Sequence, residues 1–289
     1  MLCACIDIGS NTTRLLVADA GQGTLRAVLQ DRVYTRLRGP AEVPPERIAA
    51  IADAVAGHVQ LARERGCACV RAVGTAALRD AANRDELTEA IRRRAGVAVE
   101  VLSGEEEARL AFAGATRTLP DPPRGDVGVV DVGGGSTELV VGTAAGGVSW
   151  SASLAIGSGV LADAHVRSDP PSAAELQRVR EHVAGAFEGV EVPRPPVAYA
   201  VGGSAGSLRR LAGPVLDPES LERALGELAS APAAEVAARL GLDPERVRLL
   251  PAGIVVLEQA SRALGAPLEI GRGGVREGVI LDELERRAA

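Results

Sequence analysis

The chain has 289 residues, of which 46% are hydrophobic, and its formal charge at pH 7 is −6. This length suggests two domains with large buried cores. The acidic balance argues against a nucleic-acid-binding protein, because such proteins need a basic surface. No apolar run approaches the roughly 18 residues of a membrane span, and the N-terminus lacks the charged region of a signal peptide, so we expect a cytoplasmic protein without membrane contacts.

All 32 basic residues are arginine, because the sequence contains no lysine. This excludes a Walker A phosphate loop and Schiff-base catalysis, which both depend on a lysine side chain. Any cationic contact to a phosphate must therefore come from a guanidinium group, which binds phosphate oxygens with a fork of N–H donors.

The predicted elements of the first part of the chain alternate as in α/β proteins. Strands are predicted at 2–8, 13–19, 24–36, 67–73 and 97–102, and helices at 46–65, 76–83, 84–95 and from Ser103 onward. Apolar residues at spacings of three and four define the helix at 46–65. Ser103 and Glu106 form the pattern of a capping box, which marks the start of the last of these helices. The order β-β-β-α-β-α-β-α predicts a mixed sheet with helical crossovers.

The four cysteines form two Cys-x-Cys pairs, Cys3/Cys5 and Cys67/Cys69, each at the start of a predicted strand. Zinc sites usually separate their cysteines by two to four residues, so this pattern does not favour a metal site. A free cysteine packs like a small hydrophobic residue. We therefore expect buried free thiols.

A proline-rich polar stretch at 118–125 separates two predicted domains, 1–120 and 121–289, with the last helix free to pack back on the first domain. In the second domain, strands are predicted at 127–132, 136–142, 147–155, 197–201 and 268–270, and helices at 172–185, from about Ala205 onward, in short pieces over 217–264, and at 275–287. Prolines, among them Pro251, are expected to separate the short helices.

The first turn of the second domain is Asp131-Val-Gly-Gly-Gly-Ser-Thr-Glu138. Successive glycines leave backbone N–H groups open to a close anionic ligand, since no Cβ stands in the way. Two hydroxyls follow, and a carboxylate stands at each end. This combination suits a phosphate that arrives with a divalent metal ion. The predicted phosphate-binding residues here are Gly133, Gly134, Gly135, Ser136 and Thr137.

The N-terminus repeats this pattern. Asp7–Val17 aligns without a gap with Asp131–Val141, an offset of 124 residues (131 minus 7). Two unrelated β-hairpins are the alternative, but the repeat favours two related domains that each supply a loop to one cleft. The predicted phosphate-binding residues of this first loop are Ser10, Asn11, Thr12 and Thr13.

Six segments together resemble the motif set of the exopolyphosphatase and guanosine pentaphosphate phosphatase (Ppx/GppA) family. They are Asp7–Val17, Gly74–Arg79, Ser103–Leu110, Asp131–Glu138, Gly202–Ser204 and Gly274–Gly278. The resemblance implies an α/β fold with two ribonuclease-H-like domains of the actin, sugar kinase and heat-shock ATPase superfamily around a central cleft. It also implies that the first and fourth strands are parallel neighbours, which places the two cysteine pairs side by side.

The resemblance further implies roles for the acidic residues. Glu107, directly before Ala-Arg-Leu, matches the family's catalytic base, although Glu106 beside it is the likeliest wrong choice. Asp131 and Glu138 match catalytic and metal-binding residues, and Asp7 is the corresponding acid of the first loop. The implied metal is Mg²⁺, which prefers oxygen ligands and keeps several waters.

Other matched positions concern phosphate binding. Arg79 matches the family's phosphate-contacting arginine. Gly203 and Ser204 lie where the wider superfamily contacts a nucleotide, although a turn that needs small residues explains them equally well. Val160 stands where the family commonly has an arginine. Arg276 and Glu277 are interpreted as structural, as an ion pair that ties down the last helix.

The leading hypothesis is therefore a Mg²⁺-dependent exopolyphosphatase that removes terminal phosphates from inorganic polyphosphate. Hydrolysis of guanosine pentaphosphate at its 5′ end stays open, because both substrates end in the same anhydride. A non-catalytic sensor of polyphosphate or alarmone nucleotides is a second alternative, which the departure at Val160 motivates. A sugar-kinase-like phosphotransferase is a third, and the glutamate motif at 103–110 speaks against it. A homodimer is a family-level expectation.

Overall fold

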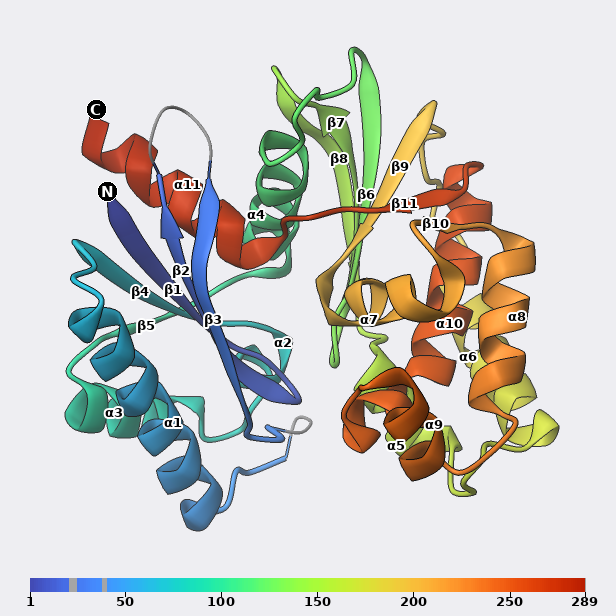
Figure 1. The fold of residues 1–289 in the computed structure, drawn as a ribbon, viewed down its shortest axis with the longest axis horizontal. Coiled ribbons are helices and arrows are strands. Elements are labelled where there is room, and N and C mark those ends of the chain that lie inside the picture. The colour runs from blue at the N-terminus through green and yellow to red at the C-terminus, as the bar shows by residue number, and fades with distance from the viewer. Residues whose placement is uncertain (21–24, 38–40, 289) are drawn as a thin grey trace. The chain divides into compact units, whose positions relative to one another are not determined.

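A computed structural model of the chain describes residues 1–20, 25–37 and 41–288. The chain divides into two units, each with its own sheet and hydrophobic core (Figure 1). The first unit consists of Met1–Thr118 together with Gly273–Ala289, and the second of Leu119–Arg272. The last helix of the chain therefore belongs to the first unit.

The first unit has the predicted order of elements. They are β1 (Leu2–Ile8), β2 (Thr12–Asp19), β3 (Arg26–Tyr34), α1 (Pro45–Glu64), β4 (Cys69–Gly74), α2 (Ala76–Arg79), α3 (Arg84–Ala95), β5 (Val99–Val101), α4 (Gly104–Arg117) and, from the end of the chain, α11 (Val275–Ala288). The sheet runs β3-β2-β1-β4-β5, with β1 antiparallel to β2 and parallel to β4. The predicted neighbourhood of the first and fourth strands is confirmed.

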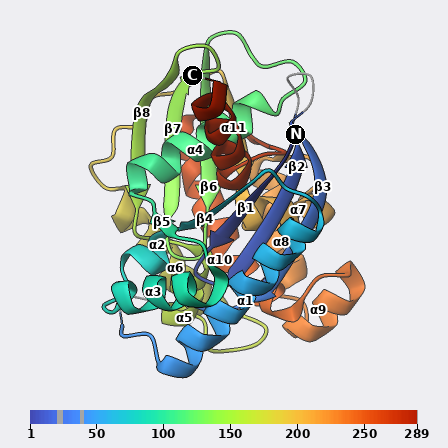
Figure 2. The same cartoon turned by 90° about the vertical axis from the view of Figure 1, so that its left-hand side faces the viewer.

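Alternation along β1 separates two cores in this unit. Ala4, Ile6 and Ile8 pack with the buried residues of α1 and α3 on one face of the sheet. Cys3 and Cys5 point to the other face, where α4 and α11 cover the sheet (Figure 2). Because successive residues of a strand point to opposite faces, a strand that is buried on both sides has no polar face, as the sequence of β1 shows.

Cys3 and Cys69 lie opposite each other in the register of β1 and β4. Their Cα atoms are 4.9 Å apart and their sulfurs form a disulfide bond. The expectation of free thiols is therefore wrong for this pair, whereas Cys5 and Cys67 are free. The family resemblance places the two cysteine pairs side by side, but it does not fix the register that sets Cys3 opposite Cys69 and Cys5 opposite Arg71.

Helix α11 lies directly against α4 in both views (Figures 1 and 2). Glycines permit this approach, because a Cβ at Gly278 would overlap the carbonyl of Leu110, and one at Gly114 would overlap the carbonyl of Gly274. The apolar side of α11 then completes the core beneath it, through Val275, Val279 and Ile280.

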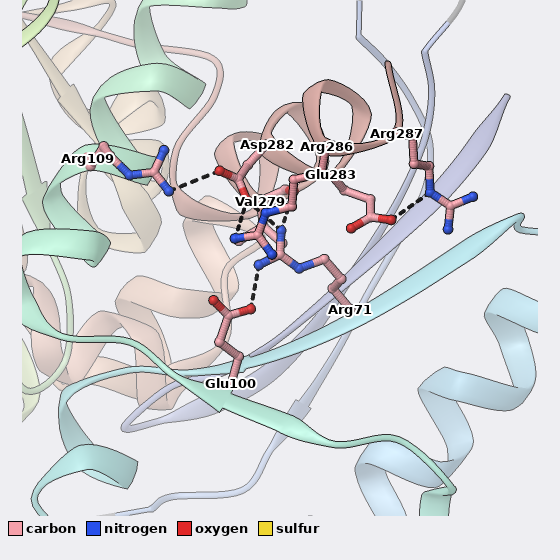
Figure 3. A network of polar contacts seen from close by, with 8 residues as sticks. All are labelled: Arg71, Glu100, Arg109, Val279, Asp282, Glu283, Arg286 and Arg287. Atoms are coloured by element: carbon pink, nitrogen blue, oxygen red, sulfur yellow. Dashed lines mark hydrogen bonds and ion pairs between the residues drawn. The ribbon is translucent and has the colours of Figure 1, made fainter. Parts of the chain in front are cut away.

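A network of charges also fastens α11 to this unit (Figure 3). Arg71 on β4 donates from Nη1 to Asp282 Oδ2 at 2.8 Å, and its Nη2 pairs with Glu100 on β5. Arg109 on α4 donates to Asp282 Oδ1 at 3.0 Å, and Arg286 pairs with Asp282 as well. Asp282 therefore links β4, α4 and α11 within the first unit.

At the start of α11, Glu277 does not form the expected ion pair with Arg276 but caps the first turn of the helix. Glu277 Oε2 accepts a hydrogen bond from Gly274 N at 2.9 Å. The electrostatic attachment of the helix comes two turns later, from Asp282. Besides Arg286 on the same helix, its arginine partners lie on β4 and α4, so the sequence pattern of the helix alone cannot identify this link between elements.

The second unit contains twelve elements among the residues that the structure describes. They are β6 (Asp126–Val132), β7 (Thr137–Thr143), β8 (Gly147–Leu154), α5 (Ser158–His165), α6 (Ala173–Phe187), β9 (Val197–Val201), α7 (Gly202–Ala212), β10 (Val215–Leu216), α8 (Pro218–Leu228), α9 (Ala233–Leu240), α10 (Pro244–Leu264) and β11 (Leu268–Ile270). The sheet runs β10-β11-β9-β6-β7-β8, with β6 antiparallel to β7 and parallel to β9.

Two local predictions for this unit fail. The sequence predicts no helix at 158–165, where the structure has α5, and it predicts a break at Pro251, through which α10 continues. A proline inside a helix costs about 3 kcal/mol. Pro251 and both its neighbours are buried in the core, and this packing offsets the cost. No helix in the described ranges combines the length and apolar character needed to cross a membrane.

Loss of the disulfide is expected to destabilise the first unit. Cys69→Ser should lower the free energy of unfolding by roughly 2–4 kcal/mol, because the bond closes a long loop in the unfolded chain. Denaturant titration measures the loss, and Cys67→Ser, at a free cysteine, is the control. Thiol titration of the unfolded, unreduced protein should detect only Cys5 and Cys67, and reaction of all four cysteines would contradict the bond.

Asp282→Asn is expected to lower the free energy of unfolding at pH 7 by roughly 2 kcal/mol, because it removes the charge that Arg71 and Arg109 share. Burial raises the pKa of Asp282, but the hydrogen bonds from these arginines outweigh it and hold the pKa below its ordinary value. The native pKa is depressed, so the stabilisation is present above the unfolded-state pKa and is lost as pH falls through the native one.

Thermal unfolding of wild type and Asp282→Asn, measured between pH 7 and pH 3, should therefore show a difference in melting temperature that disappears as the pH falls. Glu285→Gln on the exposed side of α11 is the control, since across the described part of the chain Glu285 pairs with the half-exposed Arg117 alone. A difference in melting temperature between wild type and Asp282→Asn that stayed constant with pH would contradict a stabilising role for the Asp282 charge.

Candidate functional site

The two glycine turns share one backbone geometry. Gly9 N donates to Thr12 O at 3.1 Å, and Gly133 N donates to Ser136 O at 3.0 Å. These bonds are again 124 residues apart (133 minus 9). The strands around the turns keep the same register, so the repeat seen in the sequence is also a repeat of backbone structure.

The first turn, which joins β1 to β2, contains an unpaired acceptor and an unpaired donor. Asp7 Oδ1 and Asn11 Nδ2 are both shielded from solvent and have no hydrogen-bond partner among the described residues. Buried polar groups are nearly always paired, so such atoms point to a ligand or ion. An unpaired acceptor suits a cation, and an unpaired donor suits an anionic oxygen.

Charge around Asp7 is partly balanced. Burial raises the pKa of the Asp7 carboxyl, and the nearby positive charges of Arg14 and Arg276 offset only part of this rise. Arg14 lies directly opposite Asp7 on β2, and Arg276 comes from α11. The sequence interpretation did not place Arg276 beside this loop, because α11 joins the first unit from the far end of the chain.

The hydroxyl groups of the first turn differ in their surroundings. Thr13 is fully buried and its hydroxyl shares a hydrogen bond of 3.0 Å with Thr35. Thr12 Oγ1 accepts a hydrogen bond from Arg14 Nε at 2.9 Å. These two side chains therefore hold the turn in place, while Ser10 and Asn11 remain partly exposed at its tip.

Helix α4 separates the roles of its neighbouring glutamates. Glu106 is exposed and completes the capping box, in which its carboxylate accepts from Ser103 N at 2.9 Å. Glu105 is also exposed, whereas Glu107 is only 6% exposed. The capping box therefore occupies Glu106 and leaves Glu107 as the inward-facing acid.

Arg79 and Glu107 lie together. Arg79 Nη1 donates to Glu107 Oε2 at 3.2 Å and to the backbone oxygen of Leu102 at 2.8 Å. Arg79 ends the short helix α2, which directly follows β4, and Glu107 lies in the first turn of α4, which follows β5. The parallel pairing of β4 and β5 thus brings these two predicted residues together at one edge of the sheet.

In the second unit, Asp131 and Glu138 stand directly opposite each other on β6 and β7, so their side chains leave the same face of the sheet. They are 9% and 1% exposed. Like charges at opposed positions in a sheet repel each other. Ser153 Oγ donates to Glu138 Oε1 at 2.9 Å. A divalent cation would remove the remaining repulsion, so this pair has the chemistry of a metal site.

The N-terminus of α5 binds the carbonyl groups of the glycine turn. Ser158 N and Oγ donate to Gly133 O at 3.0 and 3.1 Å, and the N–H groups of Gly159 and Val160 donate to Gly134 O at 3.0 Å. A Cβ at Gly157 would lie 2.5 Å from Gly134. The carbonyls of the turn are therefore bound on one side. The Gly-Ser-Gly pattern at 157–159 is the sequence signal for this support, because a Cβ at Gly157 or Gly159 would crowd Gly134.

Gly203 and Ser204 lie in the first turn of α7, immediately after β9. Ser204 is 1% exposed and its hydroxyl lies 3.5 Å from Ser158 Oγ, so its side chain supports the same turn. Gly202, with φ of +84°, passes so close to the Asp131 carboxylate that a Cβ would overlap it. Thr137 is likewise buried and donates to Ile156 O at 2.6 Å.

No three His, Cys, Asp or Glu side chains gather around a common point within the described ranges. A metal ion here would therefore need further oxygen ligands from water and phosphate. Mg²⁺ is commonly held in this way, by one or two carboxylates and the substrate's phosphates. The residues present thus fit such an ion.

Comparisons with known proteins point to one family. Residues 16–287 match the Ppx/GppA phosphatase family. Exopolyphosphatase 2 of Mycobacterium tuberculosis is 32% identical over an alignment that covers 96% of this chain and 96% of that protein. The guanosine-5'-triphosphate,3'-diphosphate pyrophosphatase of Aeromonas hydrophila is 29% identical over 96% of this chain and 58% of its own length.

The fold agrees with these matches. The crystal structure of the Aquifex aeolicus member of the Ppx/GppA protein family superposes with a TM-score of 0.82 at 28% identity, over 100% of this chain and 99% of that one. The two sheets of the structure are those of the actin-like ATPase fold, as expected from the sequence. The chain is a phosphatase and belongs to the Ppx/GppA phosphatase family.

Proposed function

We propose that this protein is an exopolyphosphatase that hydrolyses the terminal phosphoanhydride bond of inorganic polyphosphate with the help of Mg²⁺. The observation that carries the proposal is the buried Glu107, which the capping box leaves unused and Arg79 holds in place. A kinase needs a bound acceptor alcohol, whereas a hydrolase needs a group that orients water. The exopolyphosphatase from Mycobacterium tuberculosis supports the same substrate class.

Glu107 orients the attacking water and accepts its proton as the water oxygen bonds to the terminal phosphorus. The bond from phosphorus to the bridging oxygen breaks, and the shortened polyphosphate leaves with that oxygen. Arg79 keeps the Glu107 carboxylate in one orientation, through a side chain that is itself fixed by the Leu102 carbonyl. Such positioning is a large part of catalysis in phosphoryl transfer.

The two turns supply phosphate contacts. In the second unit these are backbone N–H groups of Gly134 and Gly135 and the Ser136 hydroxyl, and in the first unit the Asn11 amide and Ser10. Gly203, in the first turn of α7, offers a further backbone N–H. The carbonyl groups of Gly133 and Gly134 are held by α5, which leaves the N–H side of the turn for the anion.

Asp131 and Glu138 would hold Mg²⁺ from the second unit, and Asp7 is the carboxylate that the first unit offers to the same kind of ion. The ion, when bound, neutralises negative charge on the phosphate oxygens. The proposal rests on the opposed carboxylates of Asp131 and Glu138 and on the unpaired Oδ1 of Asp7.

Guanosine pentaphosphate is the second candidate substrate, which the relative from Aeromonas hydrophila favours. Its 5′ triphosphate ends in the same anhydride as polyphosphate. A binding protein without turnover does not agree with membership of a phosphatase family. Val160, whose apolar side chain is 39% exposed next to the glycine turn, therefore concerns the affinity for the substrate.

Glu107→Gln is expected to lower the rate of phosphate release by about 10²–10⁴-fold, because it removes the acceptor of the water's proton. Glu106→Gln, one residue away, should lose stability but keep its rate. Phosphate release from long-chain polyphosphate and from guanosine pentaphosphate, compared at equal Mg²⁺, decides between the substrates. Unchanged turnover in Glu107→Gln would refute the mechanism.

Gly157→Ala is expected to reduce activity without unfolding the protein. The new methyl group must push the glycine turn away from α5, and a displacement of about 1 Å can cost about 10²-fold in rate. Gly185→Ala on α6 is the control, since a Cβ there meets no neighbouring atom. Steady-state phosphate release and circular dichroism measure the two effects. Full activity in Gly157→Ala would show that the turn does not depend on this contact.

A further inference from the structure

Away from the glycine turns, four cationic or protonatable side chains gather between α5 and α6 in the second unit. His165 ends α5, and its Nε2 lies 2.9 Å from Nδ1 of His182 on α6. The ring centroids are 5.0 Å apart, in an edge-to-face arrangement. Arg178 lies one turn before His182 on the same side of α6, and Arg167 follows His165 by two residues. We call these four residues the His–Arg cluster.

The arginines of the cluster are available for a ligand. Arg167 and Arg178 are exposed, and across the described ranges neither guanidinium makes a hydrogen bond or ion pair with a protein group. Arg167 is nevertheless held in place, because its backbone N–H donates to Glu175 Oε1 on α6 at 2.7 Å. Most other arginines of this unit pair with carboxylates or carbonyls, as Arg248 does with Asp163.

The carboxylates near the cluster are engaged elsewhere. Asp163 pairs with Arg248 at 2.8 Å, and Glu181 accepts from Gln177 at 3.0 Å. Asp169 accepts from Ala233 N at 2.7 Å. Glu175 accepts from the backbone N–H groups of residues 167, 168 and 172 and from two serine hydroxyls. Among the residues that the structure describes, none of these carboxylates makes an ion pair with a member of the cluster.

The charges that reach His165 are all positive. Burial lowers the pKa of His165, and His182, Arg178 and Arg167 lower it further. A metal cation is disfavoured in such surroundings, although two imidazoles otherwise suit one. A phosphate group is favoured, because its negative charge offsets the repulsion among the four cationic groups. Its oxygens can also accept hydrogen bonds from protonated imidazoles and from both guanidinium groups.

The position of the cluster relates it to the substrate. Helix α5 binds the glycine turn at Ser158 and carries His165 at its other end, about 10 Å farther along the helix axis. A polyphosphate chain continues for many phosphate groups beyond the one that is cleaved, whereas a short phosphate cannot occupy both places.

We propose that the His–Arg cluster is a second anion-binding site, which holds the internal phosphates of a long polyphosphate chain and does so more tightly as the histidines become protonated. The proposal rests on polyphosphate being the substrate of the glycine turns. It adds a specificity for chain length and a dependence on pH that the turns themselves do not supply.

The test compares the double variant Arg167→Gln/Arg178→Gln with Arg223→Gln/Arg239→Gln, which removes the same charge from exposed, ion-paired arginines on α8 and α9. The cluster variant should raise KM for long-chain polyphosphate about tenfold, with kcat and KM for tripolyphosphate unchanged, and the control should behave as wild type. An equal rise of KM for both substrates, or none, would overturn the proposal.

Direct binding provides a readout that does not need turnover. Calorimetry with Glu107→Gln and long-chain polyphosphate at pH 8 and pH 6 should show tighter binding at pH 6, by about tenfold for each unit by which bound phosphate raises an imidazole pKa. His165→Gln/His182→Gln in the same background should remove this dependence. If polyphosphate binds with the predicted pH dependence but wild type does not hydrolyse it, the proposed function fails while the cluster stands.

Inorganic phosphate and Zn²⁺ complete the comparison. Free phosphate should bind the cluster much more weakly than the chain, because it cannot also reach the glycine turn. Zn²⁺ bound through His165 and His182, with no effect of the cluster on polyphosphate, would identify a metal site and overturn the proposal.

Discussion

One backbone hydrogen bond, made once in each unit, sets the geometry on which the candidate site depends. Gly9 N donates to Thr12 O, and Gly133 N donates to Ser136 O. Each bond closes a tight turn between antiparallel strands, so the residues that flank the turn must lie opposite each other. This places Asp7 opposite Arg14 in one unit, and Asp131 opposite Glu138 in the other. The same turn thus produces one balanced pair and one doubly negative pair, and the second has the stronger need for a cation.

Local patterns predict much of this architecture. The strand order of the first unit follows from periodicity and the family resemblance, and the offset of 124 residues between the turns holds for their hydrogen bonds as well. The choice of Glu107 follows from the family resemblance, and the capping box at Ser103, which occupies Glu106, is compatible with it. The pairing of Glu107 with Arg79 was not predicted as a contact, although both residues were named.

Contacts between distant segments account for the failures. The bond between Cys3 and Cys69 needs β1 and β4 to be in register, and the role of Asp282 needs arginines from β4 and α4. Helix α5, which places Ser158 Oγ 3.5 Å from the Ser204 hydroxyl, is not predicted by the sequence. In each case the decisive partner lies on an element whose position no local pattern encodes.

Helix α5 shows how an acidic protein can manage a polyanionic substrate. Its N-terminal donors, which would otherwise attract phosphate, are used on the carbonyls of Gly133 and Gly134. Arg79 shares its charge with Glu107, and Arg14 stands opposite Asp7. Positive charge for the rest of a long chain must then come from groups without acidic partners. The C-terminal end of α5 suits such groups, because the negative end of a helix dipole favours cations there, and the histidines and arginines around His165 stand at that end.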